Sequence, residues 1–164
     1  MQPENSPSII GIVTPVVQWG LIIFGWLVVS RDNDRREQRK EIRSMLNDIS
    51  KLIIDIQDDA HSYYVSSPDS TSSFKELKIK EKIQRLERMI DIVGQQKAGF
   101  KKKKELISFR RLVTGRQFES KERTALPSEH RLHLEISASA KDLILSLESK
   151  FQTAYTLNKR FIFF

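Results

Sequence analysis

The pattern of apolar positions divides the chain into two parts. The segment over 9–29, here called the apolar segment, has 21 residues and no charged side chain. At about 1.5 Å per residue, a helix of this length spans roughly 30 Å, the thickness of a bilayer's hydrocarbon core. Its apolar side chains surround the helix instead of forming one stripe, which disfavours a buried helix of a soluble core. We therefore expect a transmembrane helix over 9–29, after a short external tail over 1–8.

The charges beside the apolar segment predict its orientation. No Lys or Arg precedes it, whereas Arg31, Arg35 and Arg36 follow it closely. Basic residues are retained on the cytoplasmic side of a membrane. We expect a single-pass protein with its N-terminus outside and its C-terminal part in the cytoplasm, and our working location is the plasma (bacterial inner) membrane. The absence of Lys and Arg before the segment also disfavours a cleaved signal peptide.

Beyond the apolar segment the pattern is that of amphipathic helices. In the first of these, residues Ile42, Met45, Ile49, Leu52 and Ile56 alternate spacings of three and four. The same reasoning predicts a juxtamembrane and first bundle helix over 30–65 and further helices over 72–94, 101–114 and 128–160, with a linker over 115–127 and an apolar tail over 161–164. Gly94 is the expected C-cap of the second helix, and Ser128 the expected N-cap of the last.

These elements predict an all-α fold. The single N-terminal transmembrane helix should continue into a cytoplasmic antiparallel helical bundle, or a short coiled coil, because short loops join amphipathic helices. The composition agrees, since Gly and Pro are few and charged residues are abundant. There is no cysteine, which excludes disulfides and thiolate metal sites.

The net charge of +7 favours anionic partners, and its location narrows the choice. The stretch 97–116, here called the basic run, contains one acidic residue, Glu105, and eight basic ones: Lys97, Lys101, Lys102, Lys103, Lys104, Arg110, Arg111 and Arg116. Three interpretations remain open: anionic lipid headgroups, a solvated basic surface, and nucleic acid. Phe100 could enter the membrane interface, or Phe100 and Phe109 could stack on bases.

Two further sets of residues suggest contacts in the membrane. Gly11, Gln18 and Gly25 are seven residues apart and share a helix face, on which small and amide side chains favour association with another helix. We expect a homo-oligomer from this face, although Gly is also ordinary in membrane helices. At the other end, Phe161, Ile162, Phe163 and Phe164 follow two cations and suit an interfacial anchor, or else pack on protein.

Signs of catalysis are absent from the sequence. Its three histidines, His61, His130 and His133, lack a further ligand at a diagnostic spacing, and we expect them at the surface without a metal. No nucleophile elbow and no phosphate-binding glycine loop occurs. We expect no enzymatic activity and no cofactor.

The sequence leaves three functional hypotheses. The first is a membrane-anchored scaffold or regulatory module that self-associates and binds an unidentified cytoplasmic protein. The second is a membrane-perturbing effector of the toxin or anti-phage type, in which assembled apolar segments or the apolar tail over 161–164 disturb the bilayer. The third is a membrane-tethered binder of nucleic acid through the basic run.

Overall fold

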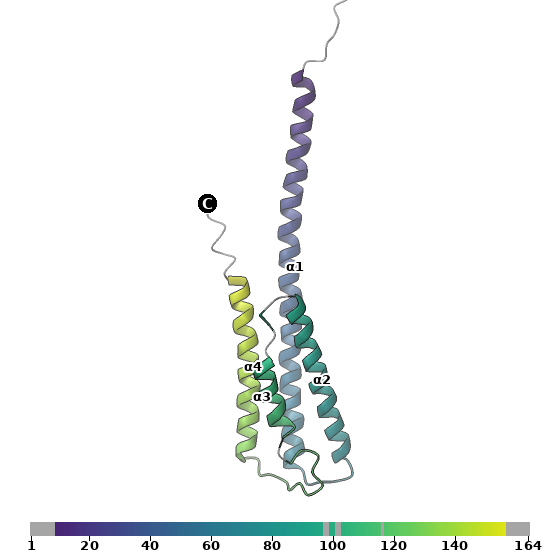
Figure 1. The fold of residues 1–164 in the computed structure, drawn as a ribbon, viewed down its shortest axis with the longest axis vertical. Coiled ribbons are helices and arrows are strands. Elements are labelled where there is room, and N and C mark those ends of the chain that lie inside the picture. Colours follow the sequence, from purple (N-terminus) through teal and green to yellow (C-terminus); the bar gives the residue numbers. More distant parts are fainter. Residues whose placement is uncertain (1–8, 97–98, 101–102, 116, 157–164) are drawn as a thin grey trace, which may run out of the picture. The chain divides into compact units, whose positions relative to one another are not determined.

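The computed structural model describes residues 9–96, 99–100, 103–115 and 117–156, with side chains for all of these except residues 9–17, 32, 103 and 156. They form four helices and no strand: α1 (Ile9–Val65), α2 (Ser72–Gln96), α3 (Lys103–Val113) and α4 (Arg131–Thr156) (Figure 1). The predicted all-α fold is confirmed. The chain divides into two units, Met1–Glu41 and Ile42–Phe164. The first contains the start of α1, and the second contains the remainder of α1 and the other three helices.

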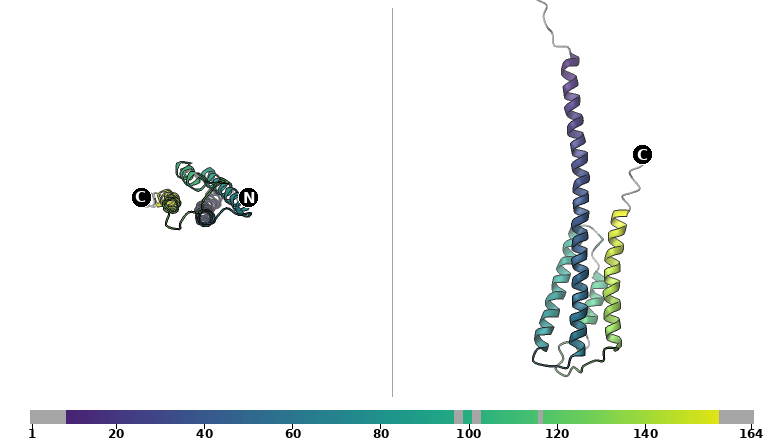
Figure 2. Two further views of the ribbon diagram at one scale, coloured as in Figure 1. Left: turned by 90° about the horizontal axis from the view of Figure 1, so that it is seen from below. Right: turned by 180° about the vertical axis from the view of Figure 1, so that it is seen from behind.

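The second unit is a helical bundle, as predicted. Within it, α2 and α4 flank the last part of α1, and α3 packs beside α4 (Figures 1 and 2). The Tyr63 hydroxyl at the end of α1 donates a hydrogen bond of 2.7 Å to Glu76 at the start of α2, so the two helices run in opposite directions. Near the end of α4, Glu148 pairs at 2.5 Å with Arg43, where the chain enters the bundle.

The core of the bundle consists of one apolar stripe from each helix. The buried residues of α1 keep the predicted spacing of three and four: Ile42, Leu46, Ile49, Ile53, Ile56, Ala60 and Tyr63. The other helices contribute Ile79, Ile83, Leu86, Ile90 and Val93 from α2, Leu106, Phe109 and Val113 from α3, and Leu132, Ile136, Leu143, Leu147 and Phe151 from α4. Each large apolar side chain buried in this way contributes about 1.5–3 kcal/mol.

The linker between α3 and α4 closes the end of α1. The Arg123 side chain, only 3% exposed, donates hydrogen bonds to the backbone carbonyls of Tyr63 and, at 2.6 Å, of Ser66. Its guanidinium lies 4.0 Å from the centre of the Tyr63 ring. The last carbonyls of a helix lack intrahelical donors and carry partial negative charge, so a buried cation is well placed there.

A tyrosine joins the ends of two helices. The Tyr64 hydroxyl, from α1, lies 2.9 Å from the Val113 carbonyl and 3.1 Å from the Gly115 carbonyl, to which it donates at the end of α3. The Tyr64 carbonyl in turn accepts a hydrogen bond of 2.8 Å from the Leu126 amide. The end of α1, the end of α3 and the linker are therefore held together by buried polar contacts.

Two predicted helix caps are wrong. Gly94 does not end α2, which continues to Gln96, and this glycine is buried inside the helix. Ser128 does not cap α4, because the chain first makes a turn in which the His130 amide donates to the Pro127 carbonyl at 2.9 Å. The cap is His130, whose Nδ1 accepts a hydrogen bond of 3.1 Å from the Leu132 amide.

Candidate functional sites

The apolar segment is helical throughout, and its side chains are described from Gln18 onward. Nine large apolar side chains in this part are 53–70% exposed: Trp19, Leu21, Ile22, Ile23, Phe24, Trp26, Leu27, Val28 and Val29. Apart from Gly20 and Gly25 they fill every position from Trp19 to Val29 and therefore surround the helix. Among the residues that the structure describes, no helix contains an apolar stretch long enough to cross a membrane. The transmembrane helix predicted over 9–29 therefore has no support from this finding.

The predicted association residues are described in part. Gln18 and Gly25 are exposed on α1, while the Gly11 position lies outside the residues with described side chains. A Cβ atom added at Gly25 or at Gly20 would meet no atom within 4 Å. Gln18 and Gly25 share a helix face because seven residues make about two turns, whereas Gly20 lies on a different face. The chain alone therefore leaves room beside both glycines.

The three arginines expected to set topology, Arg31, Arg35 and Arg36, are exposed on α1. They belong to the first unit, as does the apolar segment. Their exposure is compatible with headgroup contacts and with simple solvation.

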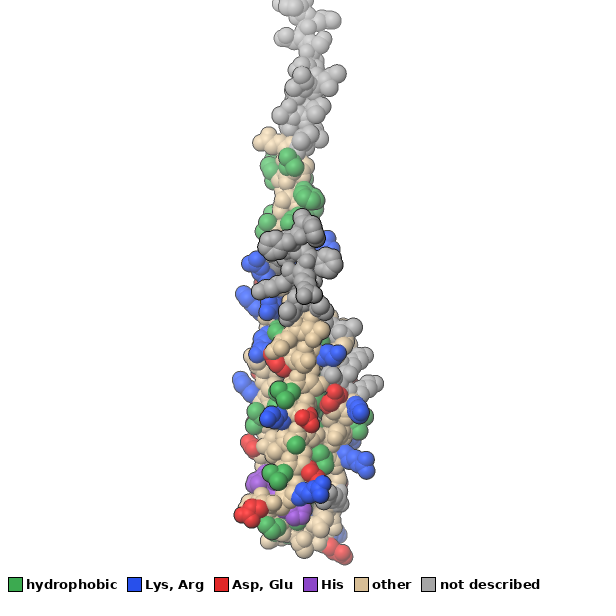
Figure 3. All heavy atoms as spheres, turned by 90° about the vertical axis from the view of Figure 1, so that its left-hand side faces the viewer, with side chains coloured by type: hydrophobic (Ala, Val, Ile, Leu, Met, Phe, Trp, Pro, Cys, Tyr) green, Lys and Arg blue, Asp and Glu red, His purple; other side chains and the backbone are tan. Residues whose placement is uncertain are grey.

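The basic run is only partly described. Lys97, Lys101, Lys102 and Arg116 lie outside the described residues, as does the side chain of Lys103. Lys104 and Arg111 are exposed on α3, and Arg110 pairs with Glu87 of α2 at 3.0 Å. At least one charge of the run is therefore balanced within the bundle. On the face shown in Figure 3, basic and acidic side chains are interspersed.

The aromatic residues of the basic run are not available to a ligand. Phe100 and Phe109 are buried in the core of the bundle. The expectation that Phe100 enters the membrane interface, or that both rings stack on bases, is wrong. The physical reason is visible in α3, where Leu106, Phe109 and Val113 form the apolar stripe of a short amphipathic helix.

The apolar tail, Phe161, Ile162, Phe163 and Phe164, lies outside the described residues. The last described part of α4 carries Phe151, which is buried and has the Arg43 guanidinium 5.3 Å from its ring centre. This end of α4 therefore lies beside the residues with which the chain enters the bundle at Ile42.

The clearest cluster of polar side chains is formed by residues whose meeting the sequence did not predict. All three histidines of the chain meet where α4 begins, and they are here called the histidine cluster. The rings of His61, on α1, and His133, on α4, have centroids 4.3 Å apart. The ring of His130 lies 6.5 Å from that of His133. The expectation of surface histidines is wrong for His133, which is only 6% exposed.

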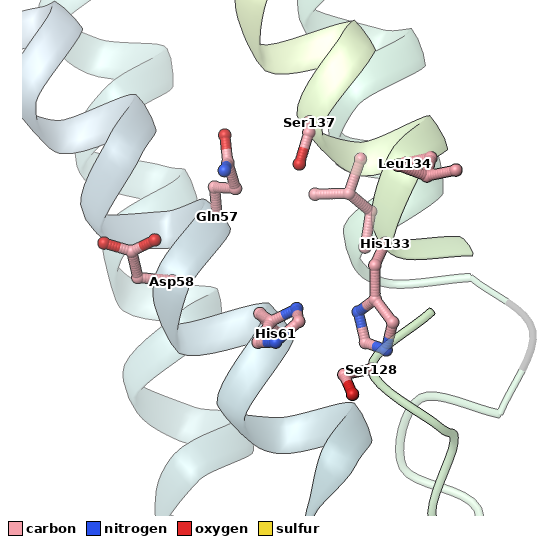
Figure 4. A pocket seen from close by; sticks show the side chains of 8 residues that line it. Gln57, Asp58, His61, Ser128, His133, Leu134 and Ser137 are labelled. Atoms are coloured by element: carbon pink, nitrogen blue, oxygen red, sulfur yellow. The ribbon is translucent and has the colours of Figure 1, made fainter. Parts of the chain in front are cut away.

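A cavity of about 350 Å³ opens beside this cluster, between α1 and α4 (Figure 4). Gln57 and Ser137 face each other across it, while His61 and His133 lie together at one end with Ser128 beneath them. Asp58 also lines the cavity, but its carboxylate points away from the two rings. The lining thus combines polar side chains with Leu134 and Ile136, and the one carboxylate in it does not point at the rings.

The ring of His133 lies in a buried environment that is unusual for a histidine. Neither of its ring nitrogens has a hydrogen-bond partner among the described residues. Burial lowers the pKa of His133, and the neighbouring His61 and His130 lower it further by charge repulsion. The Pro127 carbonyl acts to raise the pKa of His133, although neither ring nitrogen makes a hydrogen bond to it. The ring is therefore neutral at pH 7.

The described residues contain no group of three or more His, Asp or Glu side chains arranged to hold a metal ion. His130 also uses its Nδ1 as a helix cap. The cluster could have been suspected from the sequence only if the pairing of α1 with α4 had been known, because His61 is far from the other two along the chain.

Comparison with known proteins adds no assignment, since no family model, no curated protein and no solved structure matches this chain.

Proposed function

We propose that this chain is a membrane-anchored helical interaction module. In the proposal, the apolar segment is a single transmembrane anchor with its N-terminus outside the cell. The bundle lies in the cytoplasm and binds a protein partner. The observation that carries the proposal is the exposure of nine consecutive or nearly consecutive large apolar side chains around α1.

The physical reason is the cost of leaving this surface in water. Apolar area in contact with water is unfavourable by about 25 cal/mol for each Å². Monomeric soluble proteins rarely expose a contiguous apolar patch of more than a few hundred Å². A protein partner would usually cover one side of a helix, whereas lipid covers every side, as this distribution requires. The arginines that follow favour the proposed orientation.

Self-association is part of the proposal. Gln18 and Gly25 lie on one face, and the space beside Gly25 is open in the single chain. Another copy of α1 could approach closely at a glycine, and a Gln amide in lipid gains from a hydrogen bond to a neighbouring helix. We expect Gly25→Leu to reduce association strongly, as measured by cross-linking in lipid vesicles. Gly20→Leu is the matched control, because Gly20 is equally open but lies on another face.

The bundle offers a place for a protein partner at the start of α2. Phe74 and Leu77 are 70% and 63% exposed, and they are three residues apart on one face. We propose that a cytoplasmic protein covers this pair. Substituting both residues with Glu should remove a co-purifying partner without altering the helical content measured by circular dichroism.

The two other hypotheses receive less support. A nucleic-acid binder would use the lysines and arginines of the basic run, but Phe100 and Phe109 are buried and Arg110 is paired with Glu87. A membrane-perturbing effector rests on the composition of the apolar segment alone. Binding of RNA with a steep salt dependence, lost in the variant with Lys101–Lys104 replaced by Ala, would favour the first of these. Dye uptake on expression would favour the second.

The anchor can be tested by charging it. We expect the wild-type chain to remain in the membrane fraction of a bacterial host after washing with alkaline carbonate. The double variant Leu21→Glu/Phe24→Glu should leave that fraction, because each charge at the centre of a span is unfavourable by about 2.5–3.5 kcal/mol. The control variant, Ile107→Glu/Leu134→Glu, adds the same two charges at similarly exposed apolar positions of the bundle. It should stay in the membrane fraction.

A further inference from the structure

The histidine cluster has no role in the proposed anchor, and its chemistry does not depend on that proposal. The cluster contains every histidine of the chain, in two helices and the turn between Pro127 and α4. Histidine is the side chain that ordinarily changes charge between pH 5 and 8. We propose that the histidine cluster is an acid-sensitive contact, which holds the start of α4 against α1 at neutral pH and releases it below about pH 6.

The first observation is the short separation of His61 and His133. Two rings with centroids 4.3 Å apart pack well when both are neutral. When both carry a proton, two positive charges lie at nearly this distance across the interface of α1 and α4, and they repel each other. Protonation of both rings therefore weakens this contact between the two helices.

The second observation is the burial of His133. Its ring nitrogens lack partners among the described residues, so a protonated ring would carry two N–H donors without an acceptor in a buried site. The pKa of His133 lies below its usual 6.5 because of burial, with His61 and His130 acting in the same direction. In the released state this pKa returns toward 6.5, so the released state binds more protons. The closed state is therefore fully favoured above pH 6.5 and loses stability as the pH falls from there toward the lowered pKa.

The third observation is the cap at His130. Its Nδ1 accepts the Leu132 amide at 3.1 Å, which requires that nitrogen to be unprotonated. A proton on Nδ1 would abolish the cap and place a positive charge at the N-terminus of α4, where the helix dipole disfavours cations. The cap at His130 and the burial of His133 thus both suit unprotonated ring nitrogens.

The surrounding charges do not reverse this preference. The ionisable residues that line the cavity or stand next to the histidines of the turn and α4 in the sequence are Asp58 and His61 on α1, Glu129 and His130 in the turn, and Arg131 and His133 on α4. Asp58 points away from the rings in Figure 4. Glu129 is exposed to solvent. Arg131 adds positive charge at the start of α4, although it pairs with Glu135 at 2.7 Å.

The opposite end of the same two helices should not respond in this pH range. There Arg43 pairs with Glu148 at 2.5 Å, and the three histidines of the chain all lie at the other end. The acid-sensitive contact therefore predicts a local opening in which α4 separates from α1 at its first turns only.

The absence of cysteine makes this opening measurable with pairs of spin labels. One pair, Ser62→Cys with Ala138→Cys, reports the end with the histidine cluster, and a second, Asp48→Cys with Ser149→Cys, reports the opposite end; all four positions are exposed. The full chain in detergent micelles, with a metal chelator present, is measured at pH 7.5 and pH 5.0. We expect the first distance distribution to broaden and lengthen at pH 5.0, and the second to stay unchanged.

Three variants decide whether the histidines cause the change. His61→Gln is at an exposed position and removes one charge of the pair, so it should reduce the response even if the buried variant His133→Phe fails to fold. His130→Asp keeps a cap that accepts a hydrogen bond at both pH values, and should also reduce the response. An unchanged first distance in the wild type, an equal change at both ends, or a full response in His61→Gln together with His130→Asp would each overturn the proposal.

Discussion

Replacing Arg123 with Met should destabilise the bundle more than replacing any other charged residue of the linker. The side chain is 3% exposed and donates to the carbonyls of Tyr63 and Ser66. Met has a similar length and no donor, so the variant leaves both carbonyls without this partner. It also removes the guanidinium that lies 4.0 Å from the Tyr63 ring centre.

The size of the effect follows from three contributions. Each buried carbonyl left unpaired costs about 1–3 kcal/mol, and the contact of cation and ring contributes about 0.5–2 kcal/mol. Removing a buried cation recovers several kcal/mol of desolvation, which offsets part of the loss. We expect the free energy of unfolding to fall by about 2–4 kcal/mol, since unpairing a buried charge network is among the larger single-residue effects. For a bundle of this size, the midpoint temperature should fall by roughly 6–15 °C.

The assay is thermal unfolding of the full chain in detergent micelles, followed by circular dichroism at 222 nm. Arg131→Met is the control, because the Arg131 side chain is 86% exposed and pairs only with Glu135 among the contacts that the structure gives. It should change stability by less than about 1 kcal/mol. Arg123→Lys should fall between the two, because an ammonium does not match two carbonyls as a planar guanidinium does. Equal midpoints for Arg123→Met and Arg131→Met would refute this account of the closed helix end.

Three further outcomes concern the bundle. Gly115→Ala should lower the free energy of unfolding in urea by about 1–3 kcal/mol, because the added Cβ would collide with a backbone carbonyl of α3. An unchanged free energy of unfolding would contradict the close approach of Gly115 to that carbonyl. Tyr64→Phe should cost about 1–2 kcal/mol in the same assay, since the carbonyls at the end of α3 lose their shared donor; a gain in stability would contradict it. For Asp59, burial acts to raise the pKa, but the ion pair with Lys82 at 2.8 Å and the hydrogen bond from Lys78 at 3.0 Å outweigh it and hold the pKa below its usual value of 3.8. This contribution to stability is present above about pH 4 and is lost as the pH falls through the lowered pKa, so Asp59→Asn should show a smaller loss of stability between pH 5 and pH 2; an unchanged acid profile would show that the pairs contribute nothing.

Much of the bundle follows from local sequence patterns. The stripe from Ile42 to Tyr63 keeps its spacing of three and four over six turns, and those residues are buried. Similar stripes locate α2 and the core of α4. Local patterns are sufficient here because each helix must bury one face, whichever neighbour covers it.

The sequence did not predict the contacts that depend on which helices pack together. Phe100 and Phe109 stand among lysines and arginines in the sequence, and only the packing of α3 against the bundle shows them to be buried. Arg123 follows no periodic pattern, and its partners are carbonyls about sixty residues earlier. His133 and His61 likewise meet only because α4 returns beside α1.

Helix ends were predicted less well than helix interiors. Ser128 has the side chain of a good N-cap, but the turn that starts at Pro127 delays the helix until Arg131 and gives the cap to His130. Gly94 was expected to end α2, but it is buried inside the helix, which continues to Gln96. In both cases the surrounding packing outweighs the local preference for a cap.

The most direct test of the central claim is the topology of the chain in a bacterial membrane. Two single-cysteine variants, Ser6→Cys before the apolar segment and Ser67→Cys in the turn after α1, give unambiguous labelling because the chain has no other cysteine. With a thiol reagent that cannot cross membranes, the proposal predicts labelling of Ser6→Cys in intact cells and labelling of Ser67→Cys only after the inner membrane is permeabilised. Recovery of both variants in the soluble fraction, or equal labelling of both positions before and after permeabilisation, would contradict a single membrane anchor.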